Sequence, residues 1–574
     1  MKLLIKYLRP MFKYMVVGLS IKMAATLIEL VIPYILSHII DVVVPTASVP
    51  SIIFWGVMMI VCAALALLGN MIANRMAART ARNCTESVRH DLFEKTMHLT
   101  CHASDKITVP SLESRLTSDT YNLHHFVGMM QRIGVRAPLL LVGGLIITLI
   151  LDTRLALIMI ATLPVMFAVI FFISSRGIPL YSGVQKKVDG MVRVVREDAQ
   201  GIRVIKALSK KQYERNRFDA ANRDLVHTEQ RVSYIMSLSN PIMQVALNLG
   251  LVGVVVLGAY LVDGGISEAG KIIGFQQYFT LISTAMITMT RIFTMYSKGI
   301  ASANRIGEVL DTECDITPHS TAEFPIRRTG DHICFDKVSF AYNENKHVVR
   351  NISFTLPRGK TLGIIGATGS GKSTLIRLLM RFYDVSEGSI RIGGEDVRTI
   401  DNDRLHRMFG VALQNDFIYA ATIRENIDFG RGLSQEAIRK AAERAQALEF
   451  IEAFPEGFEH EITSKGTNIS GGQKQRLLIA RALAGDPEIL ILDDSSSALD
   501  YKTDLNLRRA IGEIGGDTTV ILVAQRISSV MNSDLILVLD EGEIIGAGSH
   551  AELLESCDVY REISESQMGG AFVE

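Results

Sequence analysis

The sequence predicts an α-helical transmembrane bundle of six spans with long cytoplasmic helical extensions, fused to an α/β domain of the P-loop type. Two observations predict this division. Long stretches without charged side chains fill the first three hundred residues, and a short apolar strand, a glycine-rich loop and a helix follow one another at 361–382. Apolar residues make up 48% of the chain and the formal net charge is zero. This composition favours a membrane protein and suggests no nucleic-acid partner.

The six spans are assigned from apolar runs long enough to cross a bilayer. Residues 42–74 contain no charged side chain, and 133–151 is interrupted only by Arg136. The first span, 15–44, carries Lys22 and Glu29. The remaining spans are residues 155–175, 232–262 and 272–290.

The basic residues predict the orientation of these spans. The short connections near 45–51, 152–154 and 263–271 contain only Arg154 and Lys271 as basic residues. The long connections, 75–136 and 176–231, are rich in Arg and Lys, so by the positive-inside rule they lie in the cytoplasm together with both termini.

The chain therefore divides into three expected parts. A membrane domain covers 1–300, a linker covers 301–329, and a nucleotide-binding domain covers 330–574. Within the first part, the basic residues of 1–13 predict an amphipathic elbow helix on the inner membrane surface, and no secretory signal is recognised there. We expect a multi-pass protein of the bacterial plasma (inner) membrane.

The glycine-rich loop has the composition of a phosphate-binding loop. Its residues and the first of the following helix are Gly366, Ala367, Thr368, Gly369, Ser370, Gly371, Lys372, Ser373 and Thr374. Glycines allow backbone N–H groups to turn toward phosphates at a helix N-terminus, where the dipole favours anions. Lys372 is placed to reach the β- and γ-phosphates, and the Ser373 hydroxyl to bind Mg²⁺. Asp493, after the apolar run 489–492, is the expected Mg²⁺ carboxylate, acting through water. The alternative is a glycine-rich turn without a ligand.

A second glycine-rich loop indicates which class of P-loop proteins this domain resembles. Ser470, Gly471, Gly472 and Gln473 resemble the signature of ABC-type ATPases, with Ile469 where Leu is more usual. Other segments match that family in the same order, and the resemblance covers nearly all of 330–566. These segments contain Tyr342, Gln414, the run 497–500 ending in Asp500, and 546–550.

The resemblance implies an α/β P-loop ATPase domain with a helical subdomain, binding ATP and Mg²⁺. In this family the residue at Tyr342 stacks on adenine, that at Gln414 contacts Mg²⁺ and the attacking water, and that at Asp500 crosses a dimer interface. Each ATP lies between the P-loop of one subunit and the signature of the other. A second ABC half-transporter is therefore the expected partner.

Two catalytic positions depart from the family pattern. Asp494 stands where a Glu usually polarises the attacking water, and its carboxylate falls about one methylene short. Gln525 stands where a switch His is usual, and a Gln carries no positive charge to a γ-phosphate. Tolerated drift in a working site is the alternative. We expect a site that binds ATP well and hydrolyses it poorly, in a heterodimer whose other chain supplies Glu and His.

The membrane part resembles exporters of the B-type, or type IV, fold, in particular the degenerate-site subunit of bacterial heterodimeric multidrug exporters. Coupling regions are expected near 108–120 and 206–217. The expected partners are membrane lipid and a hydrophobic or amphiphilic, drug-like small-molecule cargo, but no cargo-binding residue is assigned. Alternatives are a lipid, peptide or siderophore transporter of the same fold, and an ATP-gated regulator that transports nothing.

Overall fold

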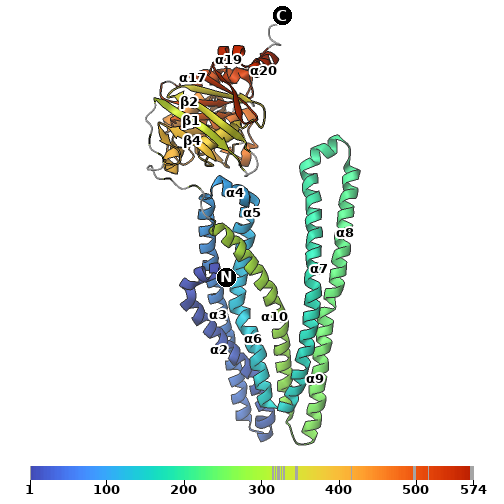
Figure 1. Ribbon diagram of the computed structural model, residues 1–574. Helices are drawn as coiled ribbons and strands as arrows, with labels where there is room; N and C mark the ends of the chain where they lie inside the picture. The colour runs from blue at the N-terminus through green and yellow to red at the C-terminus, as the bar shows by residue number, and fades with distance from the viewer. Residues whose placement is uncertain are drawn as a thin grey trace. The chain divides into compact units, whose positions relative to one another are not determined.

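The computed structural model describes residues 2–312, 330–342, 347–414, 416–494, 499–514 and 516–568, and positions 316, 319, 324 and 326. The chain forms two compact units (Figure 1). The first comprises Met1–His98 and Ile107–Thr312, and the second comprises Leu99–Lys106 and Glu313–Glu574.

The first unit is helical. Its α-helices are α1 (Lys2–Leu8), α2 (Phe12–His38), α3 (Val49–Met97), α5 (Val109–Ser114), α6 (Thr120–Leu151), α7 (Thr153–Ala207), α8 (Lys211–Ser237), α9 (Ser239–Asp263) and α10 (Ala269–Leu310). Helices α2, α3, α6 and α10 pack side by side, while α7 and α8 form a second long pair (Figure 1). The two groups meet around Leu155, Phe275 and Phe279, which are buried together with residues of α9.

The apolar segments agree in part with the expected spans. Among the described residues, four helical segments are long and apolar enough to cross a membrane: Leu3–Thr46, Val49–Met97, Val109–Leu151 and Lys211–Asp263. A fifth apolar helix, Thr153–Val169, is shorter. The expected spans at 155–175 and 272–290 lie within α7 and α10. The count of six spans stays a prediction.

The end of α10 differs from the sequence analysis. The linker was expected from residue 301, but the helix continues to Leu310. Its last turns bury Ser302, Ala303, Ile306 and Val309 at helical spacing. This buried stripe keeps the segment helical. Most of the remaining expected linker lies outside the described residues.

The described residues of the second unit form three sheets. Its strands are β1 (Asp331–Phe340), β2 (Val349–Pro357), β3 (Thr361–Gly366), β4 (Glu387–Ile392), β5 (Glu395–Asp396), β6 (Phe409–Ala412), β7 (Ala421–Thr422), β8 (Glu461–Ile462), β9 (Ile489–Asp493), β10 (Thr519–Val523), β11 (Leu535–Asp540) and β12 (Glu543–Gly548). The largest sheet has the order β12-β11-β3-β10-β9-β6, and all its neighbouring pairs are parallel except β11 with β12. The antiparallel sheet has the order β2-β1-β4-β5, and β7 pairs with β8.

Helices surround these sheets in the same unit. They are α11 (Lys372–Leu379), α12 (Asn402–Arg407), α13 (Ile423–Asp428), α14 (Gln435–Arg444), α15 (Leu448–Glu452), α16 (Gly471–Leu483), α17 (Tyr501–Gly512), α18 (Ile527–Val530), α19 (His550–Ser556) and α20 (Asp558–Met568). Helices α13 to α16 share a core with β9 that is separate from the core around β1, β2 and α11. The helical subdomain implied by the resemblance is therefore present.

A short helix from the first half of the chain belongs to the second unit. Helix α4 (Cys101–Ile107) follows α3, and its residue Asp105 accepts a 2.6 Å hydrogen bond from the Tyr383 hydroxyl. Cys101 packs against the core of the antiparallel sheet. The first coupling region was expected at 108–120, so this contact lies upstream of it. The coupling role expected for 108–120 stays a prediction.

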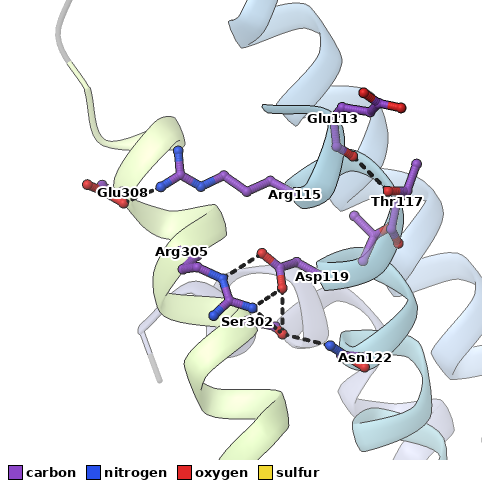
Figure 2. A network of polar contacts seen from close by, with 9 residues as sticks. Glu113, Arg115, Thr117, Asp119, Asn122, Ser302, Arg305 and Glu308 are labelled. Atoms are coloured by element: carbon purple, nitrogen blue, oxygen red, sulfur yellow. Dashed lines mark hydrogen bonds and ion pairs between the residues drawn. The ribbon is translucent and has the colours of Figure 1, made fainter. Parts of the chain in front are cut away.

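The residues expected at 108–120 take part in a different interaction. They form α5 and a π-helical turn, Arg115–Asp119, which faces the end of α10 (Figure 2). The buried Asp119 carboxylate accepts hydrogen bonds from both Arg305 nitrogens Nε and Nη2, and from the Ser302 hydroxyl at 2.8 Å. Arg115 pairs with Glu308 beside it. Charge-assisted bonds of this kind tie the start of α6 to the end of α10.

We predict that Asp119→Ala lowers the stability of the membrane unit by about 2 kcal/mol, because bonds to a buried carboxylate are lost. Thermal unfolding of the purified protein measures the change. Arg217→Gln is the matched control, since Arg217 pairs with Glu197 on the exposed surface of α7 and α8 and such pairs contribute little. Equal losses from the two variants would contradict the prediction.

Candidate nucleotide-binding site

The candidate site lies at one edge of the parallel sheet. Strands β3, β6, β9 and β10 run in the same direction, so the segments that follow them emerge at the same edge. The phosphate loop follows β3, Gln414 follows β6, Asp493 ends β9 and Gln525 follows β10. Ligands of open α/β sheets bind outside the carboxyl ends of the strands. Four sequence motifs are thus brought together by topology alone.

The phosphate loop requires glycine for two different reasons. A Cβ on Gly366 would lie 2.1 Å from the Leu539 carbonyl oxygen, so a larger residue cannot fit. Gly371 precedes α11 with φ +99°, a conformation that residues with a side chain rarely adopt. Together they hold the loop close to the N-terminus of α11. This is the geometry in which successive backbone N–H groups bind phosphate.

Lys372 is the charged group of this loop. Its residue is 9% exposed, and its Nζ donates to the carbonyl oxygens of Gly366 at 2.8 Å and Ala367 at 2.7 Å. Burial lowers the pKa of this ammonium, while the nearby charges of Asp493 and Asp494 raise it. A buried ammonium favours an anionic ligand, and a nucleotide phosphate fits this cradle.

Two oxygen groups lie where Mg²⁺ is expected. The Ser373 hydroxyl donates to the Asp493 carboxylate at 3.0 Å. Burial raises the pKa of Asp493, the hydrogen bond from Ser373 lowers it, and the charge of Asp494 raises it further. Carboxylate and hydroxyl oxygens are the hard ligands that Mg²⁺ prefers, and the ion would supply charge neutralisation between the phosphates. The residues present therefore fit the expected MgATP.

The hydroxyl group of Tyr342 contacts two residues of α11. Its hydroxyl is 3.3 Å from Thr374 Oγ1 and accepts a 3.2 Å hydrogen bond from Arg377 Nη1. Its half-buried ring makes edge contacts with Phe340 and Tyr383. The adenine-stacking role implied for Tyr342 remains a prediction. Arg377, which orients it, was not singled out from the sequence, although it follows Lys372 by little more than one helical turn.

The two unusual positions, Asp494 and Gln525, follow the neighbouring strands β9 and β10. Asp494 has φ +48°, and its backbone N–H donates to the Val523 carbonyl at 2.8 Å, which fixes it against β10. Its carboxylate accepts a 3.1 Å hydrogen bond from Gln414 Nε2. The exposed Gln525 follows strand β10. Its backbone carbonyl accepts a 2.9 Å hydrogen bond from the side chain of Gln567 on α20. Gln567 was not identified from the sequence.

The signature belongs to the other core of this unit. Ser470 caps α16 through a capping box with Gln473, with bonds of 2.9 and 3.2 Å. Ser470 and Gly471 are exposed, and within the described residues no hydrogen bond joins this loop to the phosphate loop. Asp500 caps α17, accepting from the N–H and hydroxyl of Thr503, bonds that lower its pKa. Residues 495–498, including most of the expected run 497–500, lie outside the described residues.

Comparisons with known proteins agree with this geometry. Two family models match: the ABC transporter transmembrane region over residues 15–286 and the ABC transporter domain over 349–497. The chain is 32% identical to the uncharacterized ABC transporter ATP-binding protein YfiB of Bacillus subtilis, over 98% of each chain. It is 34% identical to YknU of the same organism, over 84% of this chain and 82% of YknU.

A solved structure shares the fold. A bacterial Atm1-family ABC exporter with ATP bound superimposes with a TM-score of 0.80 over 98% of each chain, at 22% identity. The helical bundle and the phosphate site together define a membrane-embedded P-loop ATPase. The chain belongs to the ABC transporter family. Its recognition from the signature and P-loop residues is confirmed.

We predict that Lys372→Ala weakens ATP binding roughly tenfold or more, because the charge facing the phosphates is removed. Titration of the purified protein with a fluorescent ATP analogue measures this. Lys360→Ala is the matched control: Lys360 precedes the same strand, but it pairs with Asp534 at 2.8 Å. Equal effects of the two variants would contradict the assignment of the phosphate loop.

Proposed function

We propose that this chain is one half of an ATP-driven exporter, and that its own P-loop forms the degenerate ATP site of a heterodimer. The ABC fold and the fit of the phosphate loop to MgATP support ATP as the fuel. The observation that supports the asymmetry is the pair Asp494 and Gln525 at the carboxyl ends of the neighbouring strands β9 and β10, where the γ-phosphate of a bound ATP is expected.

The contact between Asp494 and Gln414 supports weak hydrolysis at this site. A general base must reach the water that attacks the γ-phosphate, and a displacement of about 1 Å can lower the rate about a hundredfold. The shorter carboxylate of Asp494 is held at 3.1 Å by the amide of Gln414. Gln525 offers hydrogen bonds but no positive charge. The P-loop nevertheless keeps its lysine, its glycines and its Mg²⁺ residues, so ATP binding is retained.

The intact signature supports a partner with a competent site. In a shared site, the Ser470 loop of this chain faces the P-loop of the other subunit. Its capping box presents the exposed Ser470 and Gly471 in a fixed conformation. A signature that keeps the family pattern, in a chain whose own base is the shorter Asp494, is useful when the other chain supplies Glu and His at its catalytic positions. ATP held at the degenerate site keeps the dimer closed, and hydrolysis at the other site reopens it.

The membrane part is proposed to span the plasma membrane six times within residues 1–300. Helix α10 continues to Leu310, a linker follows up to 329, and the ATPase domain at 330–574 is proposed to lie in the cytoplasm. Closure of the ATPase domains would turn the two bundles from inward- to outward-facing and release an amphiphilic compound. Segment 99–106 supports a first coupling contact, because it packs on the ATPase domain of its own chain. The second, near 206–217, remains a prediction that the turn between α7 and α8 makes reasonable.

We predict that two substitutions have very different effects on ATP turnover in the assembled heterodimer. Ser470→Arg abolishes ATP turnover, because the signature of this chain completes the competent site, whereas Asp494→Asn changes turnover little. Steady-state ATPase assays of the reconstituted pair measure both rates.

A control separates the loss of the cap from the loss of the signature. Ser549 caps α19 through an equivalent capping box with Glu552. Ser549→Arg should cost about 1 kcal/mol of stability but leave turnover largely intact. A large loss of turnover with Asp494→Asn would contradict the degenerate-site proposal.

A further inference from the structure

Among the described residues, Gln567 of α20 makes two hydrogen bonds to the backbone of the loop that carries Gln525. Gln567 Nε2 donates to the Gln525 carbonyl at 2.9 Å, and Gln567 Oε1 accepts from the Ile527 N–H at 2.8 Å. One amide therefore bridges residues 525 and 527. The side chain uses both its donor and its acceptor, which an amide carries on two separate atoms, the nitrogen and the oxygen.

One bond of this bridge caps the N-terminus of α18, which the side chain of its own N-cap residue does not cap. Helix α18 begins at Ile527, and its N-cap residue Arg526 makes no side-chain cap. The first N–H groups of a helix have no intrahelical partner. Gln567 acts as a cap supplied from forty residues downstream, and it fixes the backbone direction at the point where Gln525 leaves β10.

The C-terminal helix is itself firmly seated on the same core. Tyr560 is fully buried, and its hydroxyl lies 2.7 Å from His550 Nδ1. Tyr560 shares a hydrophobic cluster with Ile365 before the phosphate loop, and with Ala524 and Ile527 on either side of Gln525. Gln567 follows Tyr560 by two helical turns, on the same side of α20. The packing of α20 thus sets where the amide of Gln567 lies.

We infer that Gln567 is a positioning residue for the γ-phosphate contact of Gln525, so that the C-terminal helix sets the preference of this site for ATP over ADP. The inference rests on the proposed role of Gln525 at the γ-phosphate. Gln567 touches no phosphate; it acts through the backbone of the loop. ADP lacks the γ-phosphate, so its binding through Lys372 and the phosphate loop is independent of this bridge.

The test compares ATP and ADP affinities of the full-length chain, without a partner, in nanodiscs. An Asp494→Asn background removes the residual turnover that the chain's own site has when no partner supplies a competent one. Gln567→Ala should lower the ATP/ADP affinity ratio about fivefold, as expected for the loss of an ordinary hydrogen bond, while ADP affinity stays within about twofold. Glu565→Ala, an exposed change on the same helix, is the control and should leave the ratio unchanged.

Gln567→Glu separates the two bonds. Its carboxylate still accepts from the Ile527 N–H but faces the Gln525 carbonyl without a donor. Hydrogen exchange of the peptide 524–530 should therefore accelerate in Gln567→Ala and stay slow in Gln567→Glu, while the affinity ratio falls in both. In a Gln525→Ala background, which lowers the ratio by itself, Gln567→Ala should add nothing.

Three results would overturn the inference: an unchanged ratio in Gln567→Ala, a parallel loss of ADP affinity, or an additive effect in the Gln525→Ala background. An unchanged ATP/ADP affinity ratio in Gln525→Ala would also overturn the inference. That result would show that Gln525 does not contact the γ-phosphate as proposed. The readout is binding, so it does not depend on how fast this site hydrolyses ATP or on which partner completes it.

Discussion

The nucleotide site depends on the parallel arrangement of four buried strands. Strand β9 is buried at all five positions, and β3 is buried at its four central ones. Because parallel strands end at the same edge, the phosphate loop, the Mg²⁺ carboxylate and both unusual catalytic positions meet there. A register change in any of these strands would separate residues that are distant in sequence. The hydrophobic core of this sheet is thus a condition for the chemistry at its edge.

We propose that the ATP site of one chain is completed by a second subunit. The signature caps a helix of the second core, whose apolar residues are distinct from those that support the phosphate loop. In the proposed dimer, the site closes when the other subunit brings its own signature to this phosphate loop. Changes at residues 494 and 525 would then affect one of the two sites and leave the other available, while this chain would still bind ATP.

Much of this organisation could be predicted from the sequence, because motifs with fixed spacing carry their own geometry. Gly371 and Lys372 predicted the loop at the start of α11, and Asp493 was expected beside Ser373, where it lies at 3.0 Å. The bond between Gln414 and Asp494 joins residues eighty positions apart and follows only from strand order.

Other features had no local signal. Gln567 lies near the end of the chain in a polar helix, and its contact with the Gln525 loop arises from packing of Tyr560 and its neighbours. The extension of α10 to Leu310 was missed because the polarity of its last turns resembles that of a linker, although Ile306 and Val309 mark a buried stripe. The hydrogen bond between Tyr383 and Asp105 of α4 lies upstream of the coupling region expected near 108–120, which stays a prediction.

We propose that Asp494 and Gln525 limit ATP hydrolysis at the site formed by this chain's own P-loop. Steady-state ATPase assays of the chain purified alone, as the natural sequence and as the double variant Asp494→Glu with Gln525→His, measure this directly. We expect activity near background for the natural chain and a rise of roughly tenfold or more in the double variant, because a longer base and a chargeable switch residue are introduced. Robust activity of the natural chain, or no gain in the double variant, would show that these two residues do not limit hydrolysis.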